Sequence, residues 1–531
     1  MPERASCVIP ALLEHYAALT PDKTLVLFED GSEWTYGETL DRTRSAAAGL
    51  RKLGVDVGDT VLAWLPNGPD MLLSWFAANY LGAILVPINT SYRGKLLEHV
   101  IRQSDATLMI GHAELLPRLR QIDATRVESV LCCNGGVDTA DLPDGLTARF
   151  MAEVTEASPP VESAYPVERW DTMMIIYTSG TTGPSKGVLT TYLQQYTVGQ
   201  VSFGYMTDKD RMLVNLPMFH VGGTTAIVGM LSCGGSFALR DKFQTAQFWQ
   251  QIRDTGATGI SGFLGAMVAF LDKNEPRADD PDNPLERVVL SPVTAQTMRL
   301  AERYGFDYFS GFNMTEISVP LVTELNTRVQ SSCGKPRSGV ECRIVDEHDL
   351  PVDDGVIGEF VLRCDLPWAI NQGYHGMPEE SLKAWRNGWF HTGDLMYRDE
   401  AGNYFFVDRK KDAIRRRGEN ISSIEVEAEV AEFPAVAEVA VFGVPSEYGE
   451  DEVMAVVAGK PDMDLDPKAL IEFLVPRIAH FMVPRYLRVL AELPKTPTNK
   501  VQKTELRDAG VTADTWDREA AGIRLRKDQL N

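Results

Sequence analysis

The apolar positions of the first 130 residues follow two spacings in turn. Each short apolar run of strand length precedes a longer stretch in which apolar residues recur every three or four positions, as on one face of a helix. Such alternation predicts parallel β–α–β units. The predicted strands are Leu25–Phe28, Val61–Leu65 and Ile84–Pro87, and the predicted helices are one that Thr35 caps and Gly54 closes, Met71–Tyr80 and Leu96–Gln103.

The pattern beyond residue 130 divides the rest of the chain into further units. Their order indicates a second α/β layer, a small barrel-like subdomain and a compact α+β domain at the end. The segments are a loop-rich connector over residues 135–166, a helix at Tyr192–Val201, strand and helix pieces at Ala257–Leu271 and Arg287–Leu290, turn-rich β runs over residues 333–359, a helix at Ile424–Phe433 and a strand at Val436–Gly443.

Size and charge narrow the class of protein. At 531 residues the chain is too long for one hydrophobic core, so roughly two to four folding units are expected. A formal charge of −22 argues against general binding to nucleic acids or anionic membranes. Any site for an anionic ligand must therefore be locally basic.

Cysteine usage and the N-terminus indicate a compartment. The seven cysteines are scattered without a C-x-x-C pair, which predicts neither a disulfide framework nor a zinc site. No apolar core of signal-peptide length follows Glu3 and Arg4, and no run approaches eighteen apolar residues. We expect a cytoplasmic protein with no integral membrane association. The sequence leaves open whether two copies form a homodimer.

One stretch, Tyr177–Val188 (YTSGTTGPSKGV), combines glycines, hydroxyl residues and a lysine. It follows Met173–Ile176, an apolar run that predicts a buried strand. Glycines allow a tight turn whose backbone N–H groups converge on an anion, and the lysine adds a mobile positive charge. This combination suits a polyphosphate. The candidate phosphate-binding residues are Thr178, Ser179, Gly180, Thr181, Thr182, Gly183 and Lys186.

The stretch is not a Walker A loop, because Ser185 and Gly187 flank Lys186 where that motif has Gly and then Ser or Thr. A glycine-rich turn alone is more often a structural hairpin than a nucleotide site. Taken whole, however, the stretch resembles the phosphate loop of the adenylate-forming superfamily, which comprises acyl-CoA synthetases, luciferases and the adenylation domains of peptide synthetases.

A second segment, Phe309–Glu316 (FSGFNMTE), offers chemistry for a base and a metal. Its aromatic ring can stack on adenine, its threonine offers a hydroxyl, and its glutamate offers hard oxygen to Mg²⁺ that bridges phosphates. Alone, either side chain would be an ordinary core Phe or surface Glu. The segment resembles the superfamily's aromatic–Gly–x–Thr–Glu motif, with Asn313 where glycine is usual. Its site candidates are Gly311, Phe312, Asn313, Thr315 and Glu316, the last also as metal ligand.

Two further segments, close together in the sequence, offer partners for a ribose. Gly388–Asp394 (GWFHTGD) presents an aspartate on a glycine turn, where it can accept hydrogen bonds from both ribose hydroxyls. Asp394 matches the ribose-binding acid of the superfamily that the chain resembles. Arg409, which ends the segment Phe406–Arg409, matches the arginine that also reaches the ribose. A single Asp or Arg would be solvated surface, but the order and spacing favour two ligands.

The segment Leu216–Gly223 (LPMFHVGG) is expected to be an apolar strand end that runs into a glycine pair. A lone His220 is usually a packing residue, but an imidazole at such a strand end can line a pocket. The resemblance implies a role beside the acyl group, because the superfamily carries a similar histidine segment there. The acyl-pocket candidates are His220, Val221, Gly222, Gly223, Phe263, Ser310 and Ile317.

The resemblance continues near the C-terminus and implies a catalytic lysine there. Lys500 matches that lysine, although Asn499 replaces the usual glycine. Lys495 and Lys503 are competing candidates.

A charge-dense run, residues 408–420, sits where the superfamily has its interdomain hinge. The resemblance implies a pivot at Lys411, about which the small domain rotates between two half-reactions. Gly418 and Glu419, followed by Asn420, would then enter the site for thioester formation.

The resemblance spans roughly Pro21–Leu506 and implies an α/β fold. Residues 1–410 would form a large N-terminal domain of two doubly wound α/β subdomains and a small β-barrel-like subdomain. Residues 411–531 would form a small mobile α+β domain that carries the catalytic lysine. The residues after about Asp508 show no motif.

The implied activity is that of an acid–thiol ligase. A carboxylate is a poor acyl electrophile, and its attack on the α-phosphate of ATP, with Mg²⁺, converts its oxygen into AMP, a good leaving group, as pyrophosphate departs. The acyl group must then pass from AMP to a thiol. No internal cysteine is well placed to accept it, so a free thiol such as coenzyme A is implied as the second substrate beside the carboxylic acid.

Alternatives stay open at this point. Luciferases and amino-acid adenylation domains share these motifs, although the chain ends too soon for a carrier domain. A non-catalytic nucleotide-binding member of the fold is a rival, because Asn313, Asn499 and the turn Leu290–Thr294 (LSPVT) depart from the usual pattern. Asn371–Trp389 and the N-terminal half most resemble bacterial carnitine/crotonobetaine and medium-chain acyl-CoA ligases, but the acid is not determined.

Overall fold

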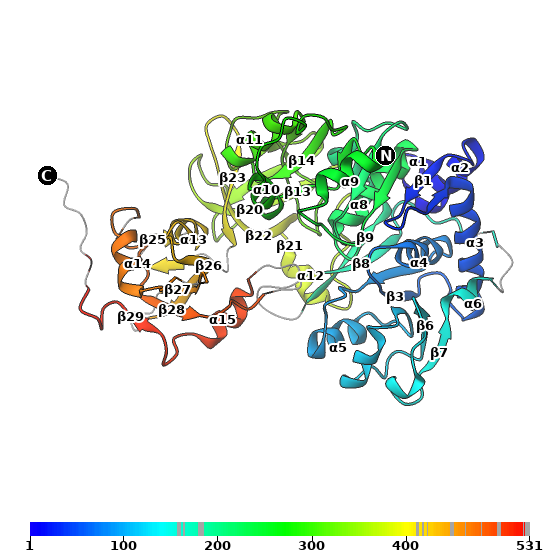
Figure 1. Cartoon of the computed structure of the whole chain (residues 1–531), viewed down its shortest axis with the longest axis horizontal. Coiled ribbons are helices and arrows are strands. Elements are labelled where there is room, and N and C mark those ends of the chain that lie inside the picture. The colour runs from blue at the N-terminus through cyan, green and yellow to red at the C-terminus, as the bar shows by residue number, and fades with distance from the viewer. Residues whose placement is uncertain are drawn as a thin grey trace.

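The computed structural model describes residues 1–156, 161–162, 165–178, 185–409, 414–416, 419–421, 423–446, 451–461, 463–478, 480–495, 501–523 and 525. Within them the N-terminal part contains a seven-stranded sheet, a second layer made of a five-stranded and a three-stranded sheet, and an eight-stranded third sheet. A four-stranded and a two-stranded sheet lie near the C-terminus (Figure 1). No helix within these ranges is long and apolar enough to cross a bilayer.

The first sheet has the strand order β7–β6–β5–β3–β4–β8–β9. Its neighbours are parallel except for β8 and β9, which pair antiparallel. The strands are mostly buried because helices cover them, as is usual for parallel sheets. They are β3 (Thr60–Trp64), β4 (Ile84–Pro87), β5 (Leu108–His112), β6 (Ser129–Cys133), β7 (Thr147–Phe150), β8 (Thr172–Thr178) and β9 (Lys186–Thr191).

A second layer has the order β12–β10–β11–β1–β2, parallel but for the β1–β2 pair, and beside it runs a parallel sheet β13–β14–β15. The strands are β1 (Thr24–Leu27), β2 (Glu33–Thr35), β10 (Arg211–Val214), β11 (Ser236–Leu239), β12 (Gly259–Ile260), β13 (Phe263–Leu264), β14 (Arg287–Ser291) and β15 (Asp307–Phe309).

Helices connect and cover these strands. The expected cap is confirmed: Thr35 Oγ1 accepts the Glu38 N–H at 3.2 Å, and the Glu38 carboxylate accepts the Thr35 N–H at 2.9 Å. The elements are α1 (Arg4–Cys7), α2 (Ile9–Leu19), α3 (Tyr36–Lys52), α4 (Pro69–Tyr80), α5 (Gly94–Gln103), η1 (Leu116–Gln121), η2 (Thr139–Asp141), α6 (Met151–Glu156), α7 (Tyr192–Phe203), α8 (Val221–Cys233), α9 (Phe248–Thr255), α10 (Gly265–Asp272) and α11 (Ala295–Tyr304).

The third sheet is antiparallel, in the order β16–β17–β18–β23–β22–β20–β19, with β21 paired to β22. Phe360, Phe390 and Tyr404 are buried at its centre. Its elements are β16 (Gly311–Phe312), β17 (Leu321–Val322), β18 (Ser332–Pro336), β19 (Val340–Val345), β20 (Gly358–Cys364), α12 (Pro378–Ala384), β21 (Trp385–Arg386), β22 (Trp389–Arg398) and β23 (Tyr404–Arg409).

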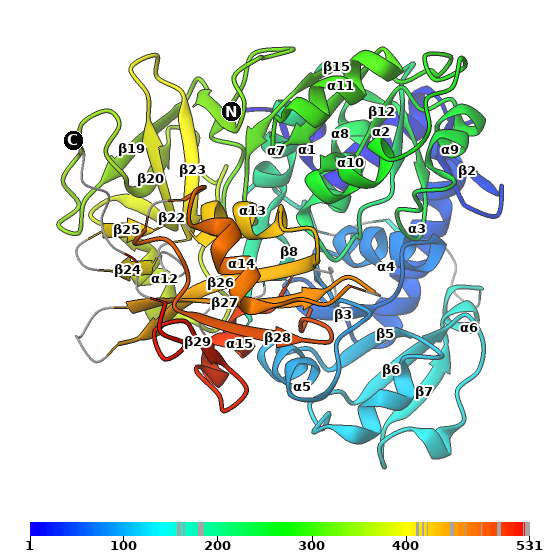
Figure 2. The same cartoon turned by 60° about the vertical axis from the view of Figure 1, so that its left-hand side comes forward.

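The C-terminal elements form a smaller body at one end of the molecule (Figure 1), and this body faces the viewer in Figure 2. Its sheet has the order β26–β27–β28–β29, and a buried ion pair joins Arg416 to Glu452 at 2.8 Å. The elements are β24 (Ile414–Arg416), β25 (Glu419–Ile421), α13 (Ser423–Ala431), β26 (Val436–Pro445), β27 (Asp451–Gly459), α14 (Pro467–Leu474), β28 (Tyr486–Leu490), α15 (Lys503–Ala509) and β29 (Trp516–Asp517).

The expected fold class is confirmed, while two local expectations are wrong. The connector over residues 135–166 contains β7, whose side chains are largely exposed, and α6. The segment Leu216–Gly223 is not a strand end: β10 stops at Val214, and the glycine pair lies in the first turn of α8. The residues after Asp508 add β29 to the C-terminal sheet.

Candidate active site

The expected phosphate loop joins two paired strands. β8 and β9 are antiparallel, and Thr178 is the cross-strand partner of Lys186. Ser185 Oγ donates to the Thr178 carbonyl oxygen at 2.6 Å, so the two ends of the loop are tied together. Thr178 and Lys186 thus lie opposite each other where the two strands enter the loop. The other phosphate candidates, Ser179, Gly180, Thr181, Thr182 and Gly183, lie outside the described residues.

Residues 372–375, in the connection between β20 of the third sheet and α12, pair with this hairpin. Gly373 O accepts the Leu189 N–H at 3.0 Å, and Gly187 O accepts the His375 N–H at 2.8 Å. Tyr374 is bridged to Val188 in antiparallel fashion. The segment therefore adds to β9 like an extra strand, and we call this contact the β9 seam.

The β9 seam brings Tyr374 between two predicted site residues. The Tyr374 hydroxyl donates to Glu316 Oε1 at 3.1 Å, and Lys186 Nζ lies 4.8 Å from the centre of the Tyr374 ring. Lys186 Nζ also pairs with Glu380 Oε2 at 2.6 Å. One network thus connects the phosphate-loop lysine with the proposed metal ligand.

Glu316 is buried and held by its backbone. Its carbonyl oxygen accepts from Asn371 N at 3.0 Å and Nδ2 at 2.8 Å. Gln194 Nε2 donates to the carbonyl oxygen of the preceding Thr315 at 2.9 Å. Burial raises the pKa of Glu316, against the opposing effects of Tyr374, Arg409 and Lys186, so its ionised form gains from a further cation.

The carboxylate fits the expected Mg²⁺. Across the described residues no group of three or more His, Cys, Asp and Glu side chains could hold a metal by itself. Mg²⁺ is ordinarily held by one or two carboxylates together with substrate phosphates and water. A single glutamate beside a phosphate loop is compatible with that mode of binding.

Asp394 and Arg409 face each other across β22 and β23. Arg409 Nε lies 2.6 Å from Asp394 Oδ1, and Asp394 is almost fully buried while Arg409 is half-exposed. The Asp394 N–H donates to Thr392 Oγ1 at 3.1 Å, and the Gly393 N–H donates to Glu359 Oε1 at 3.2 Å. Side chains on both sides therefore fix the glycine turn that carries the predicted ribose acid.

Burial raises the pKa of Asp394 to about 6, with Arg409 opposing and Glu316 adding to the rise. Only the ionised carboxylate accepts hydrogen bonds from both ribose hydroxyls. We therefore expect kcat/KM for ATP to fall about tenfold per pH unit below about pH 6, as the carboxylate protonates. Pyrophosphate release at limiting ATP between pH 5 and 8 measures this. Asp394→Asn should give a low, flat profile, and an unchanged profile in that variant would exclude Asp394 as the titrating group.

The adenine candidates lie at the edge of the antiparallel sheet. The Phe312 ring meets Phe360 edge to face at 5.6 Å and Phe406 nearly parallel at 6.5 Å. Asn313, which stands in for glycine, accepts the Val319 N–H on Oδ1 at 2.9 Å. Val319 has a φ of 46°, an unfavourable value for a β-branched residue, so the carboxamide has a structural reason to be there.

His220 is the N-cap of α8, and its exposed side chain accepts the Gly222 N–H on Nδ1 at 3.2 Å. A Cβ at Gly223 would meet the Pro217 carbonyl oxygen at 2.4 Å, which explains that glycine by packing. Phe263, Ser310 and Ile317 are buried. A role for these residues beside the acyl group stays a prediction.

The unusual turn Leu290–Thr294 continues from β14 into α11. The Ser291–Pro292 peptide is cis, and the Thr294 side chain caps the helix by accepting the Thr297 N–H. The turn that departs from the superfamily's usual pattern is thus built from a cis proline and a helix cap.

The C-terminal candidates are placed only in part. Lys500, Gly418 and the expected hinge Lys411 lie outside the described residues, and Glu419 is described only as the first backbone position of β25.

The two competing lysines have partners within the C-terminal body. Lys503 Nζ lies 2.8 Å from Glu427 Oε1 and 2.7 Å from Ser423 Oγ, and Lys495 forms an ion pair with Glu438. These contacts give both lysines partners within the C-terminal body, and the assignment of Lys500 as the catalytic lysine stays a prediction.

Sequence reasoning missed Tyr374, Glu380, Asn371 and Glu359. Two of them are far in sequence from the residues they contact: Tyr374 is 58 residues from Glu316, and Glu380 is 194 residues from Lys186. The stretch around Gly373 lies in Asn371–Trp389, which contributed to the resemblance but in which no residue was assigned a role. Only the path of the chain past β9 reveals these contacts.

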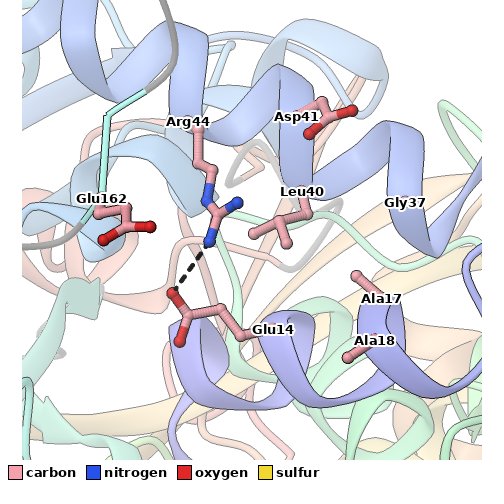
Figure 3. Close-up of a pocket in the computed structure, with 8 residues that line it drawn as sticks. All are labelled: Glu14, Ala17, Ala18, Gly37, Leu40, Asp41, Arg44 and Glu162. Atoms are coloured by element: carbon pink, nitrogen blue, oxygen red, sulfur yellow. Dashed lines mark ion pairs between the residues drawn. The ribbon is translucent and has the colours of Figure 1, made fainter.

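An open cleft elsewhere is unrelated to this site (Figure 3). It lies between α2 and α3, where Arg44 points toward Glu14 with 3.6 Å between Nη2 and Oε1. Its lining contains none of the predicted site residues and consists of Glu14, Ala17, Ala18, Gly37, Leu40, Asp41, Arg44 and Glu162.

Two family models match the chain. One, described as AMP-binding enzyme, covers residues 13–375, and another, described as AMP-binding enzyme C-terminal domain, covers residues 425–500. The chain therefore belongs to the AMP-binding enzyme family of adenylate-forming proteins, and within it to the family of AMP-forming acid–CoA ligases.

Known relatives and solved structures are similar to this chain over most of their length. The crotonobetaine/carnitine–CoA ligase of Salmonella arizonae is 30% identical over 506 residues, which are 92% of this chain and 97% of the relative. ATP-bound MatB from Rhodopseudomonas palustris is 25% identical, with a TM-score of 0.80 over 94% of this chain and 98% of that one. The O-succinylbenzoate–CoA synthetase of Bacillus subtilis in complex with ATP and magnesium ion is 24% identical, with a TM-score of 0.80 over 94% and 99%.

Proposed function

We propose that the protein activates a carboxylic acid as acyl-AMP, with release of pyrophosphate, and then transfers the acyl group to coenzyme A. The observation that carries the proposal is the grouping of four charged residues. Lys186 and Arg409 both act electrostatically on Glu316, and Arg409 pairs with Asp394. Such a group offers separate partners for the phosphates, the metal and the ribose of one nucleotide.

Each residue has a distinct task in the proposed first half-reaction. Asp394 and Arg409 hold the ribose, and Phe312 contacts the adenine. Lys186 binds the departing pyrophosphate, and Lys500 contacts the carboxylate and the α-phosphate, where negative charge gathers as the new bond forms. Mg²⁺, held by Glu316, would supply positive charge to the phosphates when bound.

In the second half-reaction the thiol of coenzyme A attacks the acyl carbonyl and AMP leaves. The thiol and Lys500 would approach the same face of the adenylate. Rotation about Lys411, which would bring Gly418 and Glu419 inward, is the proposed solution to this conflict.

The acid is proposed to be a small or medium-sized carboxylic acid, with carnitine-like betaines as the first class to examine. The support is similarity, because relatives about 30% identical over most of the chain are crotonobetaine/carnitine–CoA ligases.

The test is pyrophosphate release from ATP and Mg²⁺ across a panel of acids, each with and without coenzyme A. The panel contains betaines, short, medium and long fatty acids, aryl acids and amino acids. We expect one class to release pyrophosphate, with AMP and an acyl thioester as products only when coenzyme A is present. Release without thioester would indicate another acceptor. No release by folded protein that binds ATP would support the non-catalytic alternative.

A further inference from the structure

Glu380 is a charged neighbour of the phosphate loop that the proposed reaction does not use. It lies in the first turn of α12, and its two carboxylate oxygens are divided between two lysines. Oε2 lies 2.6 Å from Lys186 Nζ, and Oε1 lies 2.7 Å from Lys383 Nζ. Hydrogen bonds from Lys186 and then Lys383 lower the pKa of Glu380 to about 2, so it is ionised at neutral pH.

The same contacts define what surrounds the Lys186 ammonium. The Tyr374 ring covers it at 4.8 Å, and Glu380 neutralises its charge at hydrogen-bond distance. Both the lysine and the glutamate keep about a third of their side chains accessible, 29% and 34%, so the pair can be opened from solvent. The lysine therefore has two partners before it meets any phosphate.

A phosphate that approaches this lysine meets a carboxylate at the same place. It must displace Glu380 from Nζ or share the ammonium with it, and the two anions repel each other across a few ångströms. In the first case phosphate binding is weakened by the free energy of the lost Lys186–Glu380 ion pair, and in the second case it is weakened by the repulsion between the two anions. The reduction applies to any phosphate that reaches Lys186, including free pyrophosphate.

We infer that Glu380 is an internal competitor of pyrophosphate for Lys186, a positioning residue that weakens retention of this product and so assists its release. The inference rests on the proposed function, in which Lys186 binds the departing pyrophosphate. Glu380 acts through Lys186 and has no role in acid or thiol recognition.

The experiment compares Glu380→Gln with Glu379→Gln in the full chain. Glu379 is the exposed neighbour in the same turn, so its variant makes the same change in net charge without touching the Lys186 pair. Calorimetric titration with magnesium pyrophosphate reports affinity without turnover. We expect Glu380→Gln to bind pyrophosphate about threefold more tightly than Glu379→Gln, as is reasonable for a partly exposed ion pair.

A double-mutant cycle localises the effect. In a Lys186→Met background, Glu380→Gln should change pyrophosphate affinity no more than Glu379→Gln does, because the contested ammonium is gone. In turnover, Glu380→Gln should lower the inhibition constant of added pyrophosphate and leave KM for the acid unchanged. Should the glutamine variant fold poorly, Glu380→Asp, whose shorter side chain cannot span the same distance, is expected to shift affinity in the same direction.

Three results would overturn the inference. Weaker pyrophosphate binding by Glu380→Gln would make Glu380 a support for Lys186, and an effect equal to that of Glu379→Gln would reduce it to general charge. Absence of pyrophosphate binding to the unaltered chain at millimolar concentration would remove its basis. Failure of the acid panel is a separate outcome, because calorimetry reads the competition in a protein that turns over no acid.

Discussion

Replacing Lys500 with alanine is expected to lower the rate of acid-dependent pyrophosphate release by about 10²–10³-fold, the usual cost of removing one group that stabilises transition-state charge. The fold should persist, because the change removes only one side chain. The same variant, given chemically prepared acyl-AMP, should still form the thioester at close to the normal rate. Measuring the two half-reactions separately checks both statements.

Lys495→Ala and Lys503→Ala are the matched controls. Each lysine forms an ion pair inside the C-terminal body, Lys503 with the mostly buried Glu427. We therefore expect these variants to lower the melting temperature and to change adenylation by only a few-fold. If either of them abolished pyrophosphate release while Lys500→Ala did not, the catalytic lysine would have been assigned to the wrong position.

Glu316→Gln should separate activity from stability. Glutamine keeps the size of the side chain and can still accept from the Tyr374 hydroxyl, but it lacks the charge that would hold Mg²⁺. We expect about a hundredfold loss in kcat/KM for ATP and a higher Mg²⁺ concentration for half-maximal activity. Pyrophosphate release at a series of Mg²⁺ concentrations measures both effects.

The sign of the stability change follows from burial. Because the folded protein raises the pKa of Glu316, ionising the carboxyl above its unfolded pKa costs stability at neutral pH. The uncharged variant should therefore melt at the same or a higher temperature than the parent while losing activity. Tyr374→Phe, which removes the hydroxyl and keeps the ring beside Lys186, is the control. An unaltered Mg²⁺ dependence in Glu316→Gln would exclude Glu316 as the metal ligand.

Sequence patterns predicted elements best where burial and capping agree. Met71–Tyr80 and Ile84–Pro87 correspond to α4 and β4 because both are apolar on nearly every inward position. β7 escaped prediction because Thr147–Phe150 is mainly exposed and shows no alternation. α8 was misjudged because glycines at positions 222 and 223 usually end regular structure, whereas here they allow close packing in a first helical turn.

The same distinction, between residues with a local sequence pattern and residues without one, applies to the site. Lys186, Glu316, Asp394 and Arg409 belong to local motifs; Lys186 and Arg409 act electrostatically on Glu316, and Arg409 pairs with Asp394, while their roles toward a nucleotide stay predictions. Tyr374 and Glu380 lie in Asn371–Trp389, whose resemblance gave them no role, because their contacts depend on how the chain after β20 meets β9. Asn313 illustrates the converse: a departure from the usual glycine that suggested loss of function satisfies the backbone of Val319.

The β9 seam fixes more than a pair of strands. It attaches the hairpin that carries Lys186 to the segment between β20 and α12, and β20 belongs to the sheet whose strands β22 and β23 carry Asp394 and Arg409. The residues proposed for the two ends of the nucleotide, Lys186 at one end and Asp394 with Arg409 at the other, are therefore linked through this short backbone contact. Under the proposed function the distance between them must match the length of ATP, and a nucleotide one phosphate shorter, held at the ribose, would not reach Lys186.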